Sequence, residues 1–216
     1  MNAGVFADNK MDMTNASCRE FASALASSDP APGGGGAAAL IGALAASLGA
    51  MVASLTVGKK KYLDVEERMR EMRAECEGLK EELLSQVEAD ERGFLPLAAA
   101  YSIPKEDPTR QSVIDEASLG ALAAPLRIME LAHEVVSVSG ELAKKGSRLA
   151  VSDAGCAAEA ALASMRCASL NVFINTRCLS DRERAKEING RCLELLERGK
   201  REAESVFDAV LSGLLN

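Results

Sequence analysis

Four consecutive glycines, Gly33 to Gly36, follow Pro32 and lead into an uncharged, alanine-rich stretch that predicts a helix from about Gly36 to Val57. The free N–H groups at a helix N-terminus and the helix dipole both favour an anion, and glycine lets a ligand approach the backbone closely. The residues therefore predict an anion-binding loop. A plain turn that caps a core helix explains the same glycines, and both interpretations stay open at this point.

Three lysines, Lys59, Lys60 and Lys61, follow the opposite end of that helix. They could neutralise a polyanionic ligand, or they could be a solvated C-terminal cap that the helix dipole favours. Because no charge occurs from Gly33 to Gly58, a membrane span with a positive flank is a further alternative. The Ala, Gly and Ser content of the stretch favours a closely packed core helix instead, so we expect no membrane association.

A carboxylate interrupts the apolar stripe of the next predicted helix, which runs from about Asp64 to Tyr101. Asp90 stands where the spacing of three and four residues predicts Leu or Val. A carboxylate that faces a core is costly unless it is paired, protonated or turned to a ligand cavity. Asp90 is therefore the first candidate for acid–base chemistry. Arg110 extends the stripe of the following helix and could also face inward. A structural ion pair between Asp90 and a basic residue is the alternative.

Further polar candidates lie on a second alanine-rich helix, which is predicted to end near Asn175. Asn171 and Asn175 are four residues apart and could offer amide groups to a flat polar heterocycle, or they could satisfy backbone groups of neighbouring helices. Asp153, near the start of this helix, is most simply an N-cap. His133 is the only histidine, which argues against a Ser-His-Asp apparatus and against a histidine-rich metal site.

Composition limits the fold class and the partners. Of 216 residues 48% are apolar, but only 3% are aromatic and none is Trp. No segment predicts a strand, so we expect a single all-α domain over residues 1–216, a multi-helix bundle with long, partly kinked helices. The net charge of −7 argues against general nucleic-acid binding. Six scattered cysteines and the lack of a secretory segment predict a cytoplasmic protein with free thiols.

Taken in order, these motifs resemble the formimidoyltetrahydrofolate cyclodeaminase / methenyltetrahydrofolate cyclohydrolase family. The resemblance covers most of the chain, from about Phe21 into the last helix. Each motif alone is weak, but the ordered set is specific. It consists of Pro30-Ala-Pro-Gly-Gly-Gly-Gly-Ala-Ala-Ala-Leu40, Gly58-Lys-Lys-Lys-Tyr62, Asp90 with Phe94, Pro104-Lys105, Arg110, Ala121 with Pro125-Leu126, Val151-Ser-Asp-Ala-Gly155 and Asn171-Val-Phe-Ile-Asn175.

The resemblance implies a homodimeric, all-helical enzyme that uses no metal or cofactor and takes a one-carbon adduct of tetrahydrofolate as its substrate. Two activities occur in the family: cyclodeamination of 5-formiminotetrahydrofolate to 5,10-methenyltetrahydrofolate with loss of ammonia, and interconversion of the methenyl compound and 10-formyltetrahydrofolate. The sequence does not choose between them. A non-catalytic helical dimerisation or scaffold protein is the alternative outside the enzymes.

Both reactions pass through a tetrahedral carbon between N5 and N10, where a carboxylate could stabilise the cationic methenyl group and transfer protons. We expect Asp90 in this role, with Asp153 second. Contacts to folate carboxylates are expected from Gly33, Gly34, Gly35, Gly36, Lys59, Lys60, Lys61 and Arg110, and contacts to the pterin edge from Asn171 and Asn175. Two departures from the family matter: Gly36 stands where Ser is common, and the loop from Pro104 to Arg110 is short.

Overall fold

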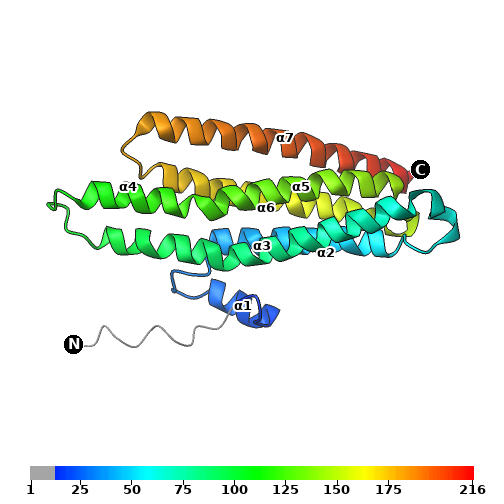
Figure 1. Ribbon diagram of the computed structural model, residues 1–216, viewed down its shortest axis with the longest axis horizontal. Coiled ribbons are helices and arrows are strands. Elements are labelled where there is room, and N and C mark those ends of the chain that lie inside the picture. Colours follow the sequence, from blue (N-terminus) through cyan, green and yellow to red (C-terminus); the bar gives the residue numbers. More distant parts are fainter. Residues whose placement is uncertain (1–12) are drawn as a thin grey trace.

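The computed structural model describes residues 13–216, which form a bundle of helices (Figure 1). No strand occurs in this part of the chain, so the predicted all-α class is confirmed. In chain order the elements are α1 (Cys18–Leu25), α2 (Gly34–Ser54), the 3-10 helix η1 (Lys60–Val65), α3 (Glu66–Tyr101), α4 (Arg110–Ala121), α5 (Ala123–Lys145), the 3-10 helix η2 (Arg148–Ala150), α6 (Val151–Thr176) and α7 (Arg182–Leu215).

Four helices that alternate in direction, α2, α3, α5 and α6, make the centre of the bundle. α2 packs against α3 and α6, and α5 packs against the same two helices. In Figure 1, α3 and α5 lie in front of α2 and α6, and α7 runs along the edge that α5 and α6 share. The predicted stripe of α3 supplies one wall of the core, because Met69, Met72, Cys76, Leu79, Leu83 and Val87 are all buried.

α2 can be central because its small residues let neighbouring helices come close. A Cβ on Gly42 would lie 2.9 Å from Ser164 Oγ of α6, and one on Gly49 would lie 2.8 Å from Cys76 Sγ of α3. Ser164 Oγ also donates a hydrogen bond of 2.7 Å to the carbonyl of Ala38. By length and composition α2 would suffice to cross a membrane, yet 56% of its most apolar window is buried among the other helices.

The stretch from Thr109 to Lys145 consists of two helices, α4 and α5, which meet at Leu122, close to Pro125. Pro125 has no N–H to donate to the carbonyl four residues earlier, that of Ala121. This carbonyl accepts instead from Asn175 Nδ2 of α6, at 3.0 Å. The interruption therefore leaves no carbonyl unsatisfied at this position, and it ties the α4–α5 junction to α6.

Candidate functional site

The start of α2 is closed by a side chain from another helix. Gly33 is the N-cap of α2, and no side chain of the glycine loop caps it. Asp90 of α3 lies directly against the loop, so that a Cβ on Gly35 would overlap its carboxylate. The N–H of Gly36 donates to the same carboxylate. The loop and Asp90, predicted as separate features, are therefore in contact.

The environment of Asp90 favours its neutral form. Partial burial raises the pKa of this carboxyl above the ordinary aspartate range, and the hydrogen bond from Gly36 opposes that shift. Within residues 13–216 no base pairs with Asp90, so the alternative of a structural ion pair is not realised there, and Arg110 binds the carbonyl of Ile103 instead. A carboxyl with a raised pKa and no paired base can give and take a proton closer to neutral pH than an ordinary aspartate.

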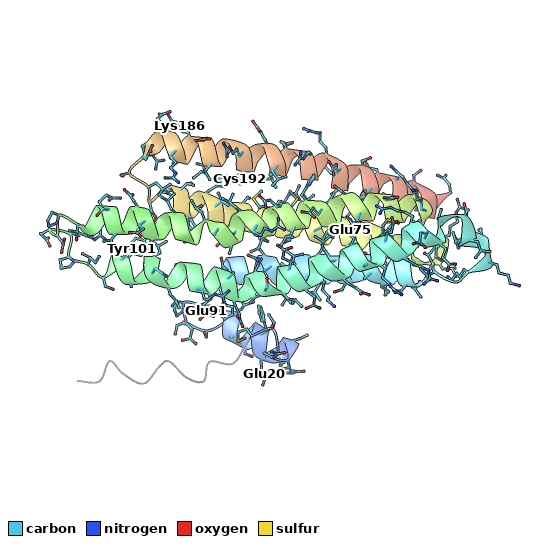
Figure 2. The ribbon with its side chains drawn as sticks, viewed as in Figure 1. Glu20, Glu75, Glu91, Tyr101, Lys186 and Cys192 are labelled. Carbon is cyan, nitrogen blue, oxygen red and sulfur yellow. The ribbon has the colours of Figure 1, made fainter. Side chains whose placement is uncertain are left out.

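Arg110 lies further along the bundle. Its Nε donates to the carbonyl of Ile103 at 2.9 Å, beside the C-terminal end of α3. Tyr101 at that end is eleven residues from Asp90, about 16 Å along a helix. Tyr101 and Cys178 share a hydrogen bond of 2.9 Å, and this bond raises the pKa of Tyr101 to about 12. Figure 2 labels Tyr101 near one end of the bundle, well away from Glu91, the residue next to Asp90.

The two asparagines occupy different environments. Asn171 faces the glycine loop, because a Cβ on Gly34 would lie 3.3 Å from Asn171 Nδ2. That nitrogen donates to the carbonyl of Cys167 at 3.0 Å. Asn175 instead donates to Ala121, in keeping with the alternative that it satisfies backbone of a neighbouring helix. This contact was not predicted, although the missing N–H of Pro125 could have indicated a free carbonyl at residue 121.

The lysines and Asp153 lie at the other end of α2. α2 has 21 residues and is therefore about 30 Å long. Beyond it, Lys59 Nζ donates to Ser147 Oγ at 3.0 Å, and Lys61 Nζ lies 5.7 Å from the centre of the Tyr62 ring. Asp153 is in the first turn of α6, whose N-cap is Ala150, so the prediction that Asp153 caps this helix is wrong. Within one chain, this end and the glycine loop cannot contact the same small group.

A groove of about 690 Å³ lies elsewhere, between α5 and α7. Several polar groups that line it are paired: Glu141 binds Arg68 and Lys145, and Ser137 donates to Glu202. The pKa of Glu141 is lowered to about 2, chiefly by Arg68, so this carboxylate is a poor proton carrier near neutral pH. None of the predicted site residues lines the groove. We therefore place the candidate site at the start of α2.

The candidate site thus consists of the Gly33–Gly36 loop, Asp90 and Asn171, with the α4–α5 junction held nearby by Asn175. Residues 13–216 contain no group of three or more His, Cys, Asp or Glu side chains placed to hold a metal ion. The chemistry that this arrangement offers is proton transfer from one partly buried carboxyl beside backbone N–H groups.

The fold and the site define the kind of protein: an all-α bundle with a candidate acid–base carboxyl against a glycine-rich helix start. The profile of the formiminotransferase-cyclodeaminase family matches residues 17–194, and the chain belongs to that family. It is 39% identical to the methenyltetrahydrofolate cyclohydrolase of Methylorubrum extorquens, over 91% of this chain and 98% of that protein. It is 29% identical to the formimidoyltransferase-cyclodeaminase of Rattus norvegicus, over 93% of this chain and 38% of that longer protein.

A solved structure agrees with the fold. The formiminotetrahydrofolate cyclodeaminase of Thermotoga maritima superposes on this chain with a TM-score of 0.80 at 27% sequence identity. The match covers 94% of this chain and 98% of that one. The similarity to this chain therefore extends over nearly the whole length of that protein.

Proposed function

We propose that this chain is a folate one-carbon enzyme that acts on the carbon bridging N5 and N10 of tetrahydrofolate. Family membership and the names of the relatives support this assignment. The structural observation that carries it is the state of Asp90: it is partly buried, has no paired base within residues 13–216, has a raised pKa and lies against the N–H of Gly36. The reactions of such substrates require proton transfer at a carbon that passes through a cationic state, which suits a group of this kind.

In the hydrolytic direction, water attacks the methenyl carbon and Asp90 as a carboxylate takes one of its protons. The tetrahedral carbon then carries a hydroxyl between N5 and N10. Its collapse breaks the bond from carbon to N5, the hydroxyl proton passes to N5, and a formyl group stays on N10. One proton is released overall. The negative carboxylate also stabilises the cationic methenyl group before attack.

In cyclodeamination the same site would act on a substrate whose leaving group is ammonia. N10 attacks the formimino carbon on N5, and the proton of N10 passes to the imino nitrogen, so that the tetrahedral carbon carries an amino group. The protonated form of Asp90 gives its proton to this amino group, the carbon–nitrogen bond breaks, and ammonia leaves the methenyl bridge behind. Partial burial makes this acid available at a higher pH than an ordinary aspartate would.

Cyclohydrolysis is our first assignment, because the relative of that name is 39% identical over nearly the full length of both chains. Cyclodeamination is second, supported by the Thermotoga maritima structure and by the rat relative. The test gives the purified chain 5,10-methenyltetrahydrofolate and 5-formiminotetrahydrofolate in separate reactions and follows the methenyl chromophore. A cyclohydrolase removes it from the first substrate, and a cyclodeaminase forms it from the second. Turnover of neither substrate would leave the scaffold alternative.

Other properties complete the proposal. We expect a cytoplasmic homodimer that needs no cofactor besides its folate substrate and binds neither nucleic acid nor membrane. The acidic balance of the chain and its six free cysteines support this expectation. Gly33 to Gly36 and Asn171 are the groups we assign to substrate binding from the same chain.

A further inference from the structure

α2 has an apolar face that no other part of residues 13–216 covers. We call it the α2 outer face. Its members are spaced alternately by four and three residues, the spacing of a helix–helix seam. Leu44 is 57% exposed, Leu55 46% and Met51 39%, whereas the other members are partly buried. The α2 outer face consists of Ala37, Ile41, Leu44, Leu48, Met51 and Leu55.

α6 enlarges this surface. It lies beside α2, at the back of the bundle as seen in Figure 1, and exposes Leu170 (67%) and Ile174 (54%). At the usual spacing of 8–10 Å, two helices of this length present a face of about 30 by 20 Å, or about 600 Å². This footprint, which includes the exposed Arg166 of α6, approaches the roughly 800 Å² that each partner brings to a standard interface.

The order of residues on the α2 outer face fits a second copy of the same face. The six residues are placed symmetrically about position 46, so an antiparallel copy related by a two-fold axis at that level forms matched pairs. Leu44 then meets Leu48 of the partner subunit. Ile41 meets Met51 of the partner subunit, and the small Ala37 meets Leu55 of the partner subunit. No charge interrupts the chain from Gly33 to Gly58, so the contact buries no ionised group of α2.

The same symmetry joins the two ends of α2. Gly33 precedes position 46 by as many residues as Lys59 follows it. We propose that a second copy of this chain packs antiparallel on the α2 outer face, and that its lysines complete the candidate site. Lys60 of the partner subunit and Lys61 of the partner subunit then lie beside the Gly33–Gly36 loop, whereas the chain's own lysines stay about 30 Å away. The inference rests on the proposed function only for its ligand, the carboxylates of the folate substrate.

The lysines are available for such a role. Lys60 and Lys61 are exposed, and in the part of the chain that the structure describes neither forms an ion pair, although most of the other basic side chains nearby do. Lys59 is engaged with Ser147. Lys61 Nζ lies over the Tyr62 ring, a contact that leaves its N–H groups able to bind an anion. Two ammonium groups beside a helix N-terminus make a site for a flexible polyanion, because they can form charge-assisted hydrogen bonds to its carboxylates.

The first experiment measures the oligomeric state by sedimentation velocity. Leu44→Glu places a charge in the centre of the proposed contact and should turn a dimer into a monomer without loss of helical circular dichroism. Leu193→Glu on α7 is the matched control, since Leu193 is 52% exposed and lies away from the face. It should remain dimeric. A parent that is monomeric, or a Leu44→Glu variant that stays dimeric, overturns the proposal. A monomeric parent that co-sediments with phosphatidylcholine vesicles also overturns the proposal, because lipid would then cover the α2 outer face in place of a second copy.

The second experiment asks whether the site is shared. Lys60→Gln/Lys61→Gln keeps Lys59 on Ser147 and should raise KM for a polyglutamyl substrate about tenfold or more. Asp90→Asn should lose turnover. When the two variant chains are unfolded together and refolded, each mixed dimer regains one intact site, and the mixture should recover about a quarter of the parental kcat/KM.

The outcomes separate the two proposals. Mixed dimers, identified by different affinity tags, that are no more active per chain than the double lysine variant alone, while the parent is active, overturn the shared site. Parental KM in the double lysine variant does the same. A parent that turns over neither folate overturns the proposed function alone, and the sedimentation result still decides the contact face.

Discussion

The two ends of α2 stabilise their backbone by different means. At the C-terminal end Thr56 donates to the carbonyl of Val52 and accepts from the N–H of Ser147, both at 2.8 Å, so neutral groups pair within a closed, buried joint. At the N-terminal end a carboxyl from α3 meets bare glycine backbone, and its pKa is raised because its charge is poorly solvated. The first arrangement is typical of structure, and the second keeps a reactive group at some cost in stability. Variants at each end should therefore change different measurements.

Asp90→Asn should produce the largest effect. Asn still offers an oxygen to the N–H of Gly36, so the start of α2 stays capped, but it cannot carry a proton. We expect kcat to fall about 10²–10⁴-fold with an unchanged circular dichroism spectrum. Asp208→Asn on α7, an exposed carboxylate, is the control and should keep the parental rate. Full turnover in Asp90→Asn would make Asp90 a structural cap.

The pH dependence of the parent and of Asp90→Asn tests whether burial raises the pKa of Asp90. Because burial raises the pKa of Asp90, the acidic limb of the parental kcat profile for hydrolysis should lie above the ordinary aspartate pKa of about 3.9. A raised folded-state pKa also means that stability falls as the pH rises from the unfolded pKa of about 3.9, and that the full cost of ionising Asp90 is present above the folded-state pKa. Asp90→Asn removes this cost, so its free energy of unfolding at pH 7, measured by urea denaturation, should not fall below that of the parent.

Gly35→Ala should produce the second-largest effect. The new Cβ would overlap the Asp90 carboxylate, so the carboxylate or the loop must move. We expect a loss of about 1–3 kcal/mol in the free energy of unfolding, as in other overpacked sites, together with a clear loss of kcat. Gly78→Ala on the same bundle meets nothing within 4 Å and should stabilise α3 by about 0.5–1 kcal/mol. Equal stability changes in the two variants would contradict the close contact.

Thr56→Val tests the opposite end. The substitution leaves the buried N–H of Ser147 without its acceptor, which should cost about 1–3 kcal/mol of unfolding free energy. The kcat of the folded enzyme should stay at the parental value, since Thr56 is buried, contacts no proposed site residue and lies about 30 Å along α2 from Asp90 of its own chain. A Ser112→Val variant is the control, because Ser112 is an exposed hydroxyl whose loss leaves no buried donor unpaired. A fall in kcat without a fall in stability would remove the distinction between the two ends.

Arg68→Met should have the smallest effect. Arg68 binds Glu141 across α3 and α5 and lowers the pKa of that carboxyl to about 2. Both side chains are partly exposed, so the loss at pH 7 should be about 0–1 kcal/mol. A lowered folded-state pKa contributes stability that is present above the unfolded value of about 4.3 and is lost as the pH falls toward 2. Denaturation curves of Arg68→Met should therefore vary less over this acid range than those of the parent.

Regular spacing made much of the fold predictable. The α3 stripe from Met69 to Val87 was read from the sequence and is buried, and the odd carboxylate in that stripe turned out to be the group at the start of α2. Contacts between distant segments were not predictable in the same way. The bond from Asn175 to Ala121 joins residues 54 positions apart and depends on how α4, α5 and α6 pack. The start of α6 was misplaced because Asp153 is an equally acceptable residue in a first turn.

The contact between Gly35 and Asp90 has a consequence for sequence variation. The carboxylate of Asp90 occupies the volume in which any side chain at position 35 would begin. The residues at these two positions can therefore change only together, although 54 others separate them in the chain. A combinatorial library that varies position 35 alone should return glycine. One that varies both positions together should return alternative pairs only among folded, inactive clones.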